Sequence, residues 1–325
     1  MLASEGFTNG IEAFGEKHSL SQAVAGSILA AVGTALPETI LPLVAILFGG
    51  GNIGKEIGVG AIMGAPFMLA TVAFFVTGLA VLAGVLAGKR KFEINAEIPT
   101  IKRDLVFFIL MFSLAVFLPI VTGGAFNRAL SVVFIAGYIV YVAKTARGES
   151  GDMVHPEGLH FLNFMKKAGF DRGTPSNILI ISQIALALAV MVSGAHLFVG
   201  SLETVSLKLG LNPMLFALLL APIATELPEK FNSVTWILKG RDSLALGNIT
   251  GAMVFQSAFP VSVGLLMTEW KLAPMAVWSA GIALFSAVIL LASIHIKKKV
   301  SPYILLFSGA LYAVYLVAAI THLRG

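Results

Sequence analysis

The stretch GTALPETILPLVAIL, residues Gly33–Leu47, has a counterpart in the second half of the chain, ATELPEKFNSVTWIL, residues Ala224–Leu238. The matched pairs are Thr34 with Thr225, Leu36 with Leu227, Pro37 with Pro228 and Glu38 with Glu229. A second match follows each stretch, GAIMGAPFML (Gly60–Leu69) against GNITGAMVFQ (Gly247–Gln256). Self-similarity of this kind predicts that the two halves of the chain are structural repeats.

The composition places the chain in a bilayer. Of 325 residues, 57% are hydrophobic and 12% are charged, and the mean hydropathy is +0.91. Soluble proteins carry about 25% charged residues. The chain has no cysteine, which excludes disulfides, thiolate metal sites and cysteine nucleophiles. The net charge of +5 comes from Lys and Arg clustered between apolar stretches, a pattern typical of membrane topology signals and not of nucleic-acid binding.

Apolar stretches long enough to cross about 30 Å of hydrocarbon occur nine times. They are residues 22–49, 57–87, 105–121, 128–143, 177–199, 212–238, 244–267, 273–295 and 301–321. The second stretch is long enough to be tilted, bent or broken. We therefore expect about nine transmembrane helices in contact with the lipid bilayer.

The basic residues give this set of spans an orientation. With nine spans, sixteen Lys and Arg residues fall on the side of the N-terminus and five on the other side. Cytoplasmic loops carry the excess of Lys and Arg, so we expect a cytoplasmic N-terminus in a cell inner (plasma) membrane. The longest connection, residues 144–176, is expected to be a cytoplasmic linker between a first half, residues 1–143, and a second half, residues 177–325.

Under this topology the two Pro-Glu segments cross the membrane in opposite directions, so the halves are expected to be inverted repeats. Pro37 and Pro228 lack a backbone N–H, and each is expected to break or kink its helix a turn upstream. Interruptions at corresponding points of two halves indicate a transporter with its site near the membrane midplane. The predicted fold is an all-α polytopic membrane protein, built from two inverted-topology repeats with broken helices at the Pro-Glu motifs.

Three carboxylates fall inside the apolar spans, those of Glu38, Glu226 and Glu229. A charged group at membrane depth costs at least about 2.5–3.5 kcal/mol on insertion scales, so each is a candidate functional residue. Thr34 and Thr225 stand close by, where the prolines are expected to free backbone carbonyls. Such an oxygen set suits a hard cation such as Ca²⁺ and lacks the imidazole and thiolate that zinc or copper favours. A protonated glutamate bonded to a neighbouring helix is the structural alternative.

The second matched segment of each half carries two glycines four residues apart, a spacing that favours close helix packing. These glycines are Gly60 with Gly64 and Gly247 with Gly251. Asn248 and Gln256 are polar residues of the later segment, and either cation binding or interhelical hydrogen bonding explains them. Lys230 lies four residues after Glu226, which favours a Glu–Lys pair on one helix face.

At these residues the chain resembles the cation/Ca²⁺ antiporter superfamily, in particular prokaryotic sodium/calcium exchangers. That family has GTSLPE-like and GN-x-x-GSN-like segments in each repeat, which stand here as GTALPE with GAIMGAP and ATELPE with GNITGAM. The resemblance implies that Ca²⁺ is bound by the repeat glutamates and threonines, which by position are Glu38, Glu229, Thr34 and Thr225. The full candidate metal site consists of these four residues together with Glu226, Gln256 and Asn248.

The chain departs from the family at the positions that help to hold Na⁺. Those positions are occupied here by Ala35, Glu226, Ala65, Ala252, Leu69 and Gln256. Most sodium-side ligands are therefore missing. Glu226 instead adds a third carboxylate close to Glu229, and like charges in a low dielectric favour one of them holding a proton. We expect H⁺, rather than Na⁺, as the counter-ion.

The predicted function is a secondary active antiporter that exchanges Ca²⁺ or a similar divalent cation for H⁺ or Na⁺ by alternating access. A cation channel is an alternative, but paired helix breaks suit alternating access better than a continuous pore. A membrane-embedded enzyme is the other alternative, but we find no HExxH, no cysteine and no plausible Ser–His pair within the spans, and three intramembrane Glu with one Lys fit ion handling better. No cofactor is expected, and the sequence gives no oligomeric state.

The orientation can be tested by cysteine labelling, because the chain has no background cysteine. Asp152→Cys should react with a membrane-impermeant maleimide only after the cells are opened, since the linker is predicted to be cytoplasmic. Asn212→Cys should react in intact cells. Labelling of Asp152→Cys from outside would overturn the predicted orientation.

Overall fold

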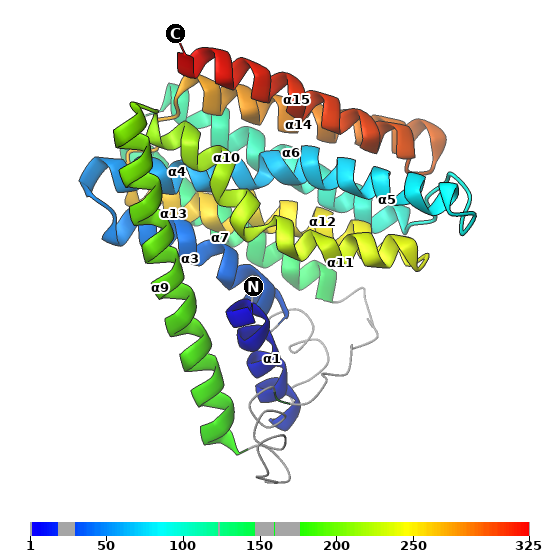
Figure 1. The fold of residues 1–325 in the computed structure, drawn as a ribbon, viewed down its shortest axis with the longest axis horizontal. Helices are drawn as coiled ribbons and strands as arrows, with labels where there is room; N and C mark the ends of the chain where they lie inside the picture. Colours follow the sequence, from blue (N-terminus) through cyan, green and yellow to red (C-terminus); the bar gives the residue numbers. More distant parts are fainter. Residues whose placement is uncertain (1, 19–29, 123, 147–158, 160–175, 325) are drawn as a thin grey trace.

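The computed structural model describes residues 2–18, 30–122, 124–146, 159 and 176–324, and these residues are helical with no named strand (Figure 1). The helices are α1 (Leu2–Lys17), α3 (Ala30–Phe48), α4 (Gly51–Met68), η2 (Leu69–Ala73), α5 (Phe74–Leu86), α6 (Ile98–Val121), α7 (Gly124–Ala146), α9 (Asn177–Leu209), α10 (Pro213–Thr225), α11 (Leu227–Leu238), α12 (Asp242–Gln256), α13 (Phe259–Met267), α14 (Pro274–Lys297) and α15 (Pro302–Arg324).

Within the described residues, seven helical segments are long and apolar enough to cross a membrane. They are Gly51–Leu86, Ile98–Val121, Phe126–Thr145, Asn177–Leu209, Asp242–Met267, Pro274–Lys297 and Pro302–Thr321. The predicted span 22–49 begins among residues that are not described, and the predicted span 212–238 is divided between α10 and α11. An all-helical membrane protein is therefore confirmed for this part of the chain, whereas nine crossings remain a prediction.

Two helices extend well beyond their predicted spans because local signals set their ends. α6 begins at Ile98 and not at 105, with a proline in its first turn, where the missing N–H costs nothing. α9 continues to Leu209 and not to 199, and it ends at Gly210, which has a φ of 65°. Glycine adopts this left-handed conformation readily, so it is a common helix terminator.

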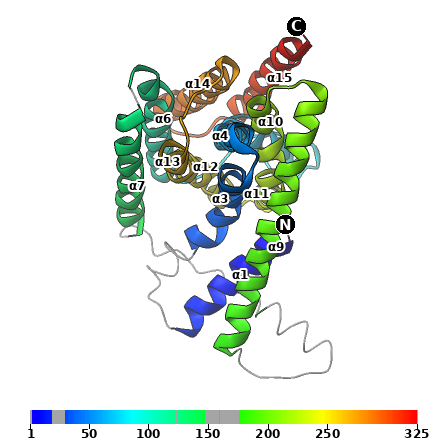
Figure 2. The ribbon, with the colours of Figure 1, turned by 90° about the vertical axis from the view of Figure 1, so that its left-hand side faces the viewer.

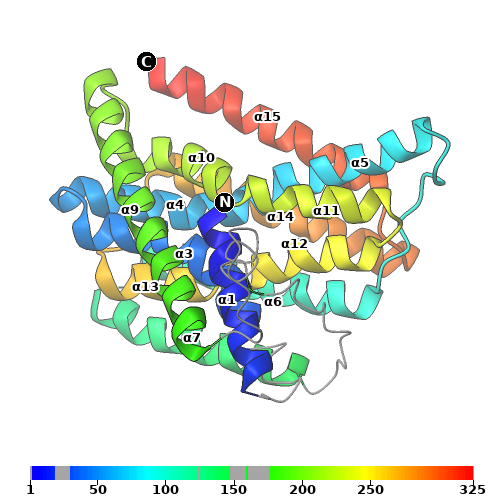
Figure 3. The same ribbon diagram turned by 60° about the horizontal axis from the view of Figure 1, so that its bottom comes forward.

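The bundle has a core of helices and a peripheral pair. α10 lies beside α4, and α11, which follows α10 end to end, lies beside α12 (Figure 3), whereas α15 lies along one outer edge. α9 packs against α1, and the lower ends of this pair extend beyond the other helices at the bottom of Figure 2, on the side away from α15. The main apolar core fills the space around α4, α6, α12 and α14, with Phe67, Phe74 and Phe112 fully buried in it.

The second predicted span is bent by a widened turn. Pro66 lies inside α4, and the π-helical turn η2 follows it before α5 continues the same helix. A proline removes one helical hydrogen bond, and here the N–H of Leu69 is shared between the carbonyls of Ala65 and Pro66. The Thr71 hydroxyl donates to the Phe67 carbonyl over 2.6 Å inside this turn. The span therefore changes its winding where it passes the centre of the bundle.

The two Pro-Glu motifs differ in local structure. α10 ends at Thr225 and α11 starts at Leu227, so a turn at Glu226 interrupts the helix at the second motif. At the first motif, α3 is helical from Ala30 to Phe48. The expected break at Pro37 is not seen, and the second motif shows only a one-residue turn, so paired helix breaks are not confirmed.

Close helix packing is present at the first glycine pair. A Cβ atom added to Gly60 would lie 2.2 Å from the Met214 carbonyl oxygen, and one added to Gly64 would lie 2.2 Å from that of Leu218. The backbones of α4 and α10 therefore touch, and α10 is the helix with which α4 makes most contacts. Gly247 and Gly251 have no atom of the described residues within 4 Å of such a Cβ, so close packing is seen for the first pair alone.

A buried carboxylate that the sequence analysis did not include connects α6, α7 and α12. Asp104 is 2% exposed and accepts hydrogen bonds from the hydroxyls of Thr250, at 2.6 Å, and Tyr141. The predicted span began at residue 105, one position too late to include it. The three carboxylates expected inside the spans are therefore joined by a fourth in α6.

The start of α12 is tied to the loop after α5. The Arg90 guanidinium donates to both oxygens of Asp242, at 2.9 and 2.8 Å, and also to the Ile237 carbonyl at 2.7 Å. The backbone N–H of Asn95 donates to Asp242 over 2.9 Å. A bidentate, largely buried pair of this kind fixes position better than an exposed ion pair does.

The glycine contact predicts a specific sensitivity of the bundle. Gly64→Leu should destabilise the protein by about 3 kcal/mol or more, because the new side chain has no room against the α10 backbone. The matched control is Gly194→Leu on exposed α9, which has no described atom within 4 Å of an added Cβ and should have little effect. The measurement is the thermal unfolding midpoint in detergent. Equal midpoints for the two variants would show that α4 and α10 do not depend on this contact.

Candidate cation-binding site

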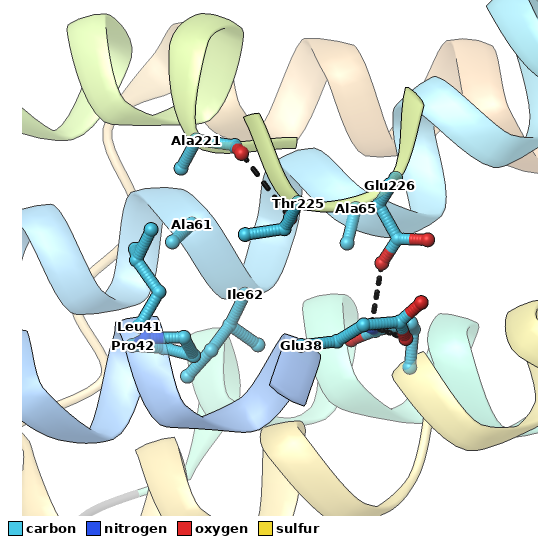
Figure 4. Close-up of a pocket in the computed structure, with 10 residues that line it drawn as sticks. Glu38, Leu41, Pro42, Ala61, Ile62, Ala65, Ala221, Thr225 and Glu226 are labelled. Atoms are coloured by element: carbon cyan, nitrogen blue, oxygen red, sulfur yellow. Dashed lines mark hydrogen bonds between the residues drawn. The ribbon is translucent and has the colours of Figure 1, made fainter. Parts of the chain in front are cut away.

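A small pocket lies where α3, α4, α10 and α12 meet (Figure 4). Its free volume is about 10 Å³, close to what one water-sized sphere occupies. It is lined by Glu38, Leu41, Pro42, Ala61, Ile62, Ala65, Ala221, Thr225, Glu226 and Gln256. The lining therefore combines residues from both halves of the chain.

Two carboxylates meet in this pocket through one amide group. The Gln256 Nε2 donates to Glu38 Oε2 over 2.6 Å and to Glu226 Oε1 over 2.7 Å. The exposed fractions are 7% for Glu38, 0% for Glu226 and 2% for Gln256. Figure 4 shows the Glu38 and Glu226 side chains pointing toward one another from α3 and from the turn after α10. Buried carboxylates in a bilayer need such partners, because no water is present to hydrogen-bond them.

Local backbone structure places Glu226 at the pocket. The backbone N–H of Glu226 donates to the Pro222 carbonyl over 2.8 Å, and Glu226 is also the N-cap residue of α11. The Glu226 side chain makes no capping hydrogen bond to α11, and its carboxylate binds the Gln256 amide in the pocket instead. The neighbouring Thr225 hydroxyl donates to the Ala221 carbonyl over 3.2 Å, so it lines the pocket while bonded to its own helix.

A buried ammonium group accompanies Glu226. The Lys230 Nζ lies 3.6 Å from Glu226 Oε2, and the two side chains are 2% and 0% exposed. The Glu–Lys pair expected from the four-residue spacing is therefore present, on the first turn of α11. Removing either member of a buried pair leaves an uncompensated charge, which is strongly destabilising.

The structure brings together four of the seven predicted site residues, namely Glu38, Thr225, Glu226 and Gln256. The side chains of Thr34 and Glu229 lie outside the part of the chain that the structure describes. In the described pocket, Glu226 is the carboxylate that shares the Gln256 amide with Glu38. The pairing of Glu38 with Glu229, expected from the matched motifs, is not tested and stays a prediction.

Asn248 does not line the pocket. Its Nδ2 donates to the Ser233 hydroxyl over 3.2 Å, which links α12 to α11. This is the interhelical hydrogen bond that was the alternative explanation for Asn248. The apolar lining residues Leu41, Ile62 and Ala221 were not predicted, because apolar residues in an apolar span carry no distinguishing signal.

The donor set in the pocket is two carboxylates, an amide and a hydroxyl. Among the described residues, no group of three or more His, Cys, Asp or Glu side chains is placed to hold a metal ion. Oxygen ligands suit hard cations such as Ca²⁺ and Mg²⁺, which can keep bound water as further ligands. Zinc and copper instead favour imidazole and thiolate ligands. The side chains of the pocket therefore suit a hard cation that is bound by few protein ligands.

Comparison with known proteins agrees with this chemistry. The family described as "Sodium/calcium exchanger protein" matches residues 1–145 and 179–321. Inner membrane protein YrbG of Escherichia coli (strain K12) is 23% identical over 259 residues, which cover 78% of this chain and 72% of that protein.

Two solved structures share the fold. The H⁺/Ca²⁺ exchanger CAX aligns with a TM-score of 0.70 at 17% identity, over 98% of this chain and 78% of CAX. The sodium-calcium exchanger NCX_Mj aligns with a TM-score of 0.57 at 17% identity, over 97% of this chain and 93% of NCX_Mj. At these identities the likeness shows the fold alone. The family match spans most of both halves, and the chain is therefore an integral membrane protein of the sodium/calcium exchanger family, a family of transporters and not of enzymes.

Proposed function

We propose that this chain is a secondary active antiporter that exchanges Ca²⁺, or a similar divalent cation, for H⁺ or Na⁺ by alternating access. The observation that carries the proposal is the meeting of Glu38, from the first half, with Glu226, from the second half, at one buried pocket. Two carboxylates supply the charge that neutralises a divalent cation, and the Thr225 hydroxyl in the pocket lining supplies a neutral oxygen. The fold neighbours CAX and NCX_Mj exchange Ca²⁺ for H⁺ and for Na⁺ respectively, by their names.

We also propose that residues 1–143 and 177–325 are inverted repeats, joined by a cytoplasmic linker at 144–176. The contacts at the pocket support this arrangement, since they are reciprocal. α10, which leads into the second Pro-Glu motif, packs on the glycine pair of α4 in the first half. α3, which carries the first Pro-Glu motif, meets Gln256 of α12 in the second half. A two-fold relation between the halves produces this exchange of partners.

The proposed cycle follows from the charge of the pocket. A buried pair of carboxylates is costly in a bilayer unless cations or hydrogen bonds compensate it. Either a divalent cation or its counter-ions provide that compensation, so each ion leaves as the other arrives. Because the pocket is small and enclosed by four helices, exposure to either side requires the helices to move, which is alternating access.

We propose H⁺ as the counter-ion. The positions that hold Na⁺ in the family are apolar here at Ala65, Leu69 and Ala252, and Ala65 lines the pocket. Glu38 and Glu226 share one amide and are the two charged residues of the pocket lining, so their carboxylates are the groups that take up the counter-ion. A proton needs no further oxygen ligands, whereas Na⁺ does.

The central assignment predicts the effect of neutralising either carboxylate. In proteoliposomes, Glu38→Gln and Glu226→Gln should each reduce ⁴⁵Ca²⁺ uptake by at least about a hundredfold, since losing a buried charge partner costs about 3 kcal/mol or more. The control is Glu269→Gln, a fully exposed residue paired with Lys271, which should transport at the parental rate. If either pocket variant takes up ⁴⁵Ca²⁺ at the parental rate, the substituted glutamate is not part of the cation site.

The counter-ion is tested by imposing one gradient at a time. An outward H⁺ gradient at nominally zero Na⁺ should drive ⁴⁵Ca²⁺ uptake, and Glu226→Gln should blunt this response. A Na⁺ gradient at equal pH should drive little uptake. Robust uptake with the Na⁺ gradient alone would refute H⁺ coupling while leaving the exchange of Ca²⁺ intact. Uptake that never saturates and needs no cation on the opposite side would indicate a channel.

A further inference from the structure

The amide of Gln256 presents its nitrogen, and not its oxygen, to the two carboxylates. A side-chain NH₂ group has two N–H bonds, and Nε2 uses them on Glu38 Oε2 at 2.6 Å and on Glu226 Oε1 at 2.7 Å. An ionised carboxylate only accepts hydrogen bonds, so the nitrogen is the atom that can lie between two of them. The amide therefore binds both carboxylates as a donor.

A positively charged group, the Lys230 ammonium, lies near the other oxygen of Glu226. The Lys230 Nζ is 3.6 Å from Glu226 Oε2, and among the described residues this oxygen accepts no hydrogen bond. The attraction is therefore electrostatic, and it is weakly screened because both side chains are at most 2% exposed. One side of the Glu226 carboxylate faces an amide N–H and the other side faces an ammonium group.

We propose that Gln256 and Lys230 form a donor clasp, a protein-borne substitute for the transported cation that competes with it for Glu38 and Glu226. The clasp rests on the proposed function, in which these two carboxylates bind the cation. It makes Gln256 and Lys230 positioning residues that set cation affinity.

Competition follows from the lone pairs. A cation held between Glu38 and Glu226 needs the carboxylate lone pairs that the Gln256 N–H groups occupy, and Nε2 offers a cation no lone pair in return. Either Gln256 turns its oxygen inward or its side chain moves aside. The cation must therefore break two charge-assisted hydrogen bonds before both carboxylates can bind it.

The charge of Lys230 also weakens cation binding by Glu38 and Glu226. With both carboxylates ionised, Glu38 and Glu226 contribute −2 and Lys230 contributes +1, so these three groups sum to −1. A divalent cation is attracted less strongly than by the carboxylates alone. After the cation leaves, the clasp compensates part of the buried charge until the counter-ion arrives, which lowers the cost of that step in the bilayer. Binding is weakened and release is eased, as a transporter requires.

If the clasp competes with Ca²⁺, removing it should raise the affinity for Ca²⁺. Removing a residue that only binds Ca²⁺ should lower that affinity. Gln256→Met keeps the length of the side chain and removes the donors, so the KM for Ca²⁺ should fall about tenfold and Vmax should fall with it. Lys230→Met should likewise lower KM, while Lys230→Arg keeps the charge and should stay near the parental value. Ser257→Ala, next to Gln256 but bonded to the Val254 carbonyl, is the matched control and should not change KM.

Two results would overturn the clasp. The first is a KM for Ca²⁺ that is unchanged or raised in Gln256→Met, as expected if Gln256 is only a ligand. If Gln256→Met does not fold, the infrared spectrum of the parental protein, described next, decides. The second is a Ca²⁺-induced infrared difference spectrum of the parental protein, in which the glutamine side-chain amide band stays unmoved. A parental protein with neither Ca²⁺ uptake nor any Ca²⁺-induced infrared change would overturn the proposed function as well.

Discussion

The lack of side chains at Gly60 and Gly64 allows α4 to lie directly against the backbone of α10. In a bilayer, helices gain little from burying apolar groups against one another, so close packing of small residues supplies much of their attraction. This contact fixes the end of α10, and with it the turn at Glu226, over Ala61 and Ala65 of α4. The position and the small volume of the pocket both follow from it.

A second constraint is that every buried polar group in the bundle needs a partner. α12 meets this requirement at three levels along its length, each time with a residue of the first half. Asp242 binds Arg90 at its start, Thr250 binds Asp104 in its middle, and Gln256 binds Glu38 at its end. These contacts hold the helix in register with the first half, so the amide of Gln256 arrives between the carboxylates with its orientation fixed.

The same constraint connects stability with exchange. Groups that compensate a buried carboxylate in the absence of a cation also oppose binding of that cation, because both use the same lone pairs. An exchanger benefits from this opposition, since an ion bound too tightly is not released. The pocket of this chain has this character. Ala65 in its lining offers no side-chain oxygen, and an amide and an ammonium group lie near Glu226.

Much of the fold and part of the site could be predicted from local sequence. Apolar length predicts membrane helices, and the repeated Pro-Glu motif marks Glu38 and the region of Glu226, because hydropathy and spacing are properties of neighbouring residues. Helix ends were less well predicted, as the early start of α6 and the late end of α9 show. Asp104 was missed because its position lies just before the apolar run.

By itself, the sequence determined that the chain is a helical membrane protein with paired motifs and intramembrane carboxylates. Only the tertiary structure decided which of these groups meet. Glu38 and Gln256 are 218 residues apart, and the helical period does not specify how far each helix is rotated about its axis. That rotation points Gln256 at the carboxylates and directs Asn248, on the same helix, toward Ser233 instead. The glycine spacing predicts close packing at Gly60 and Gly64 but not that α10 is the partner, and no local pattern encodes which buried polar groups of distant helices pair.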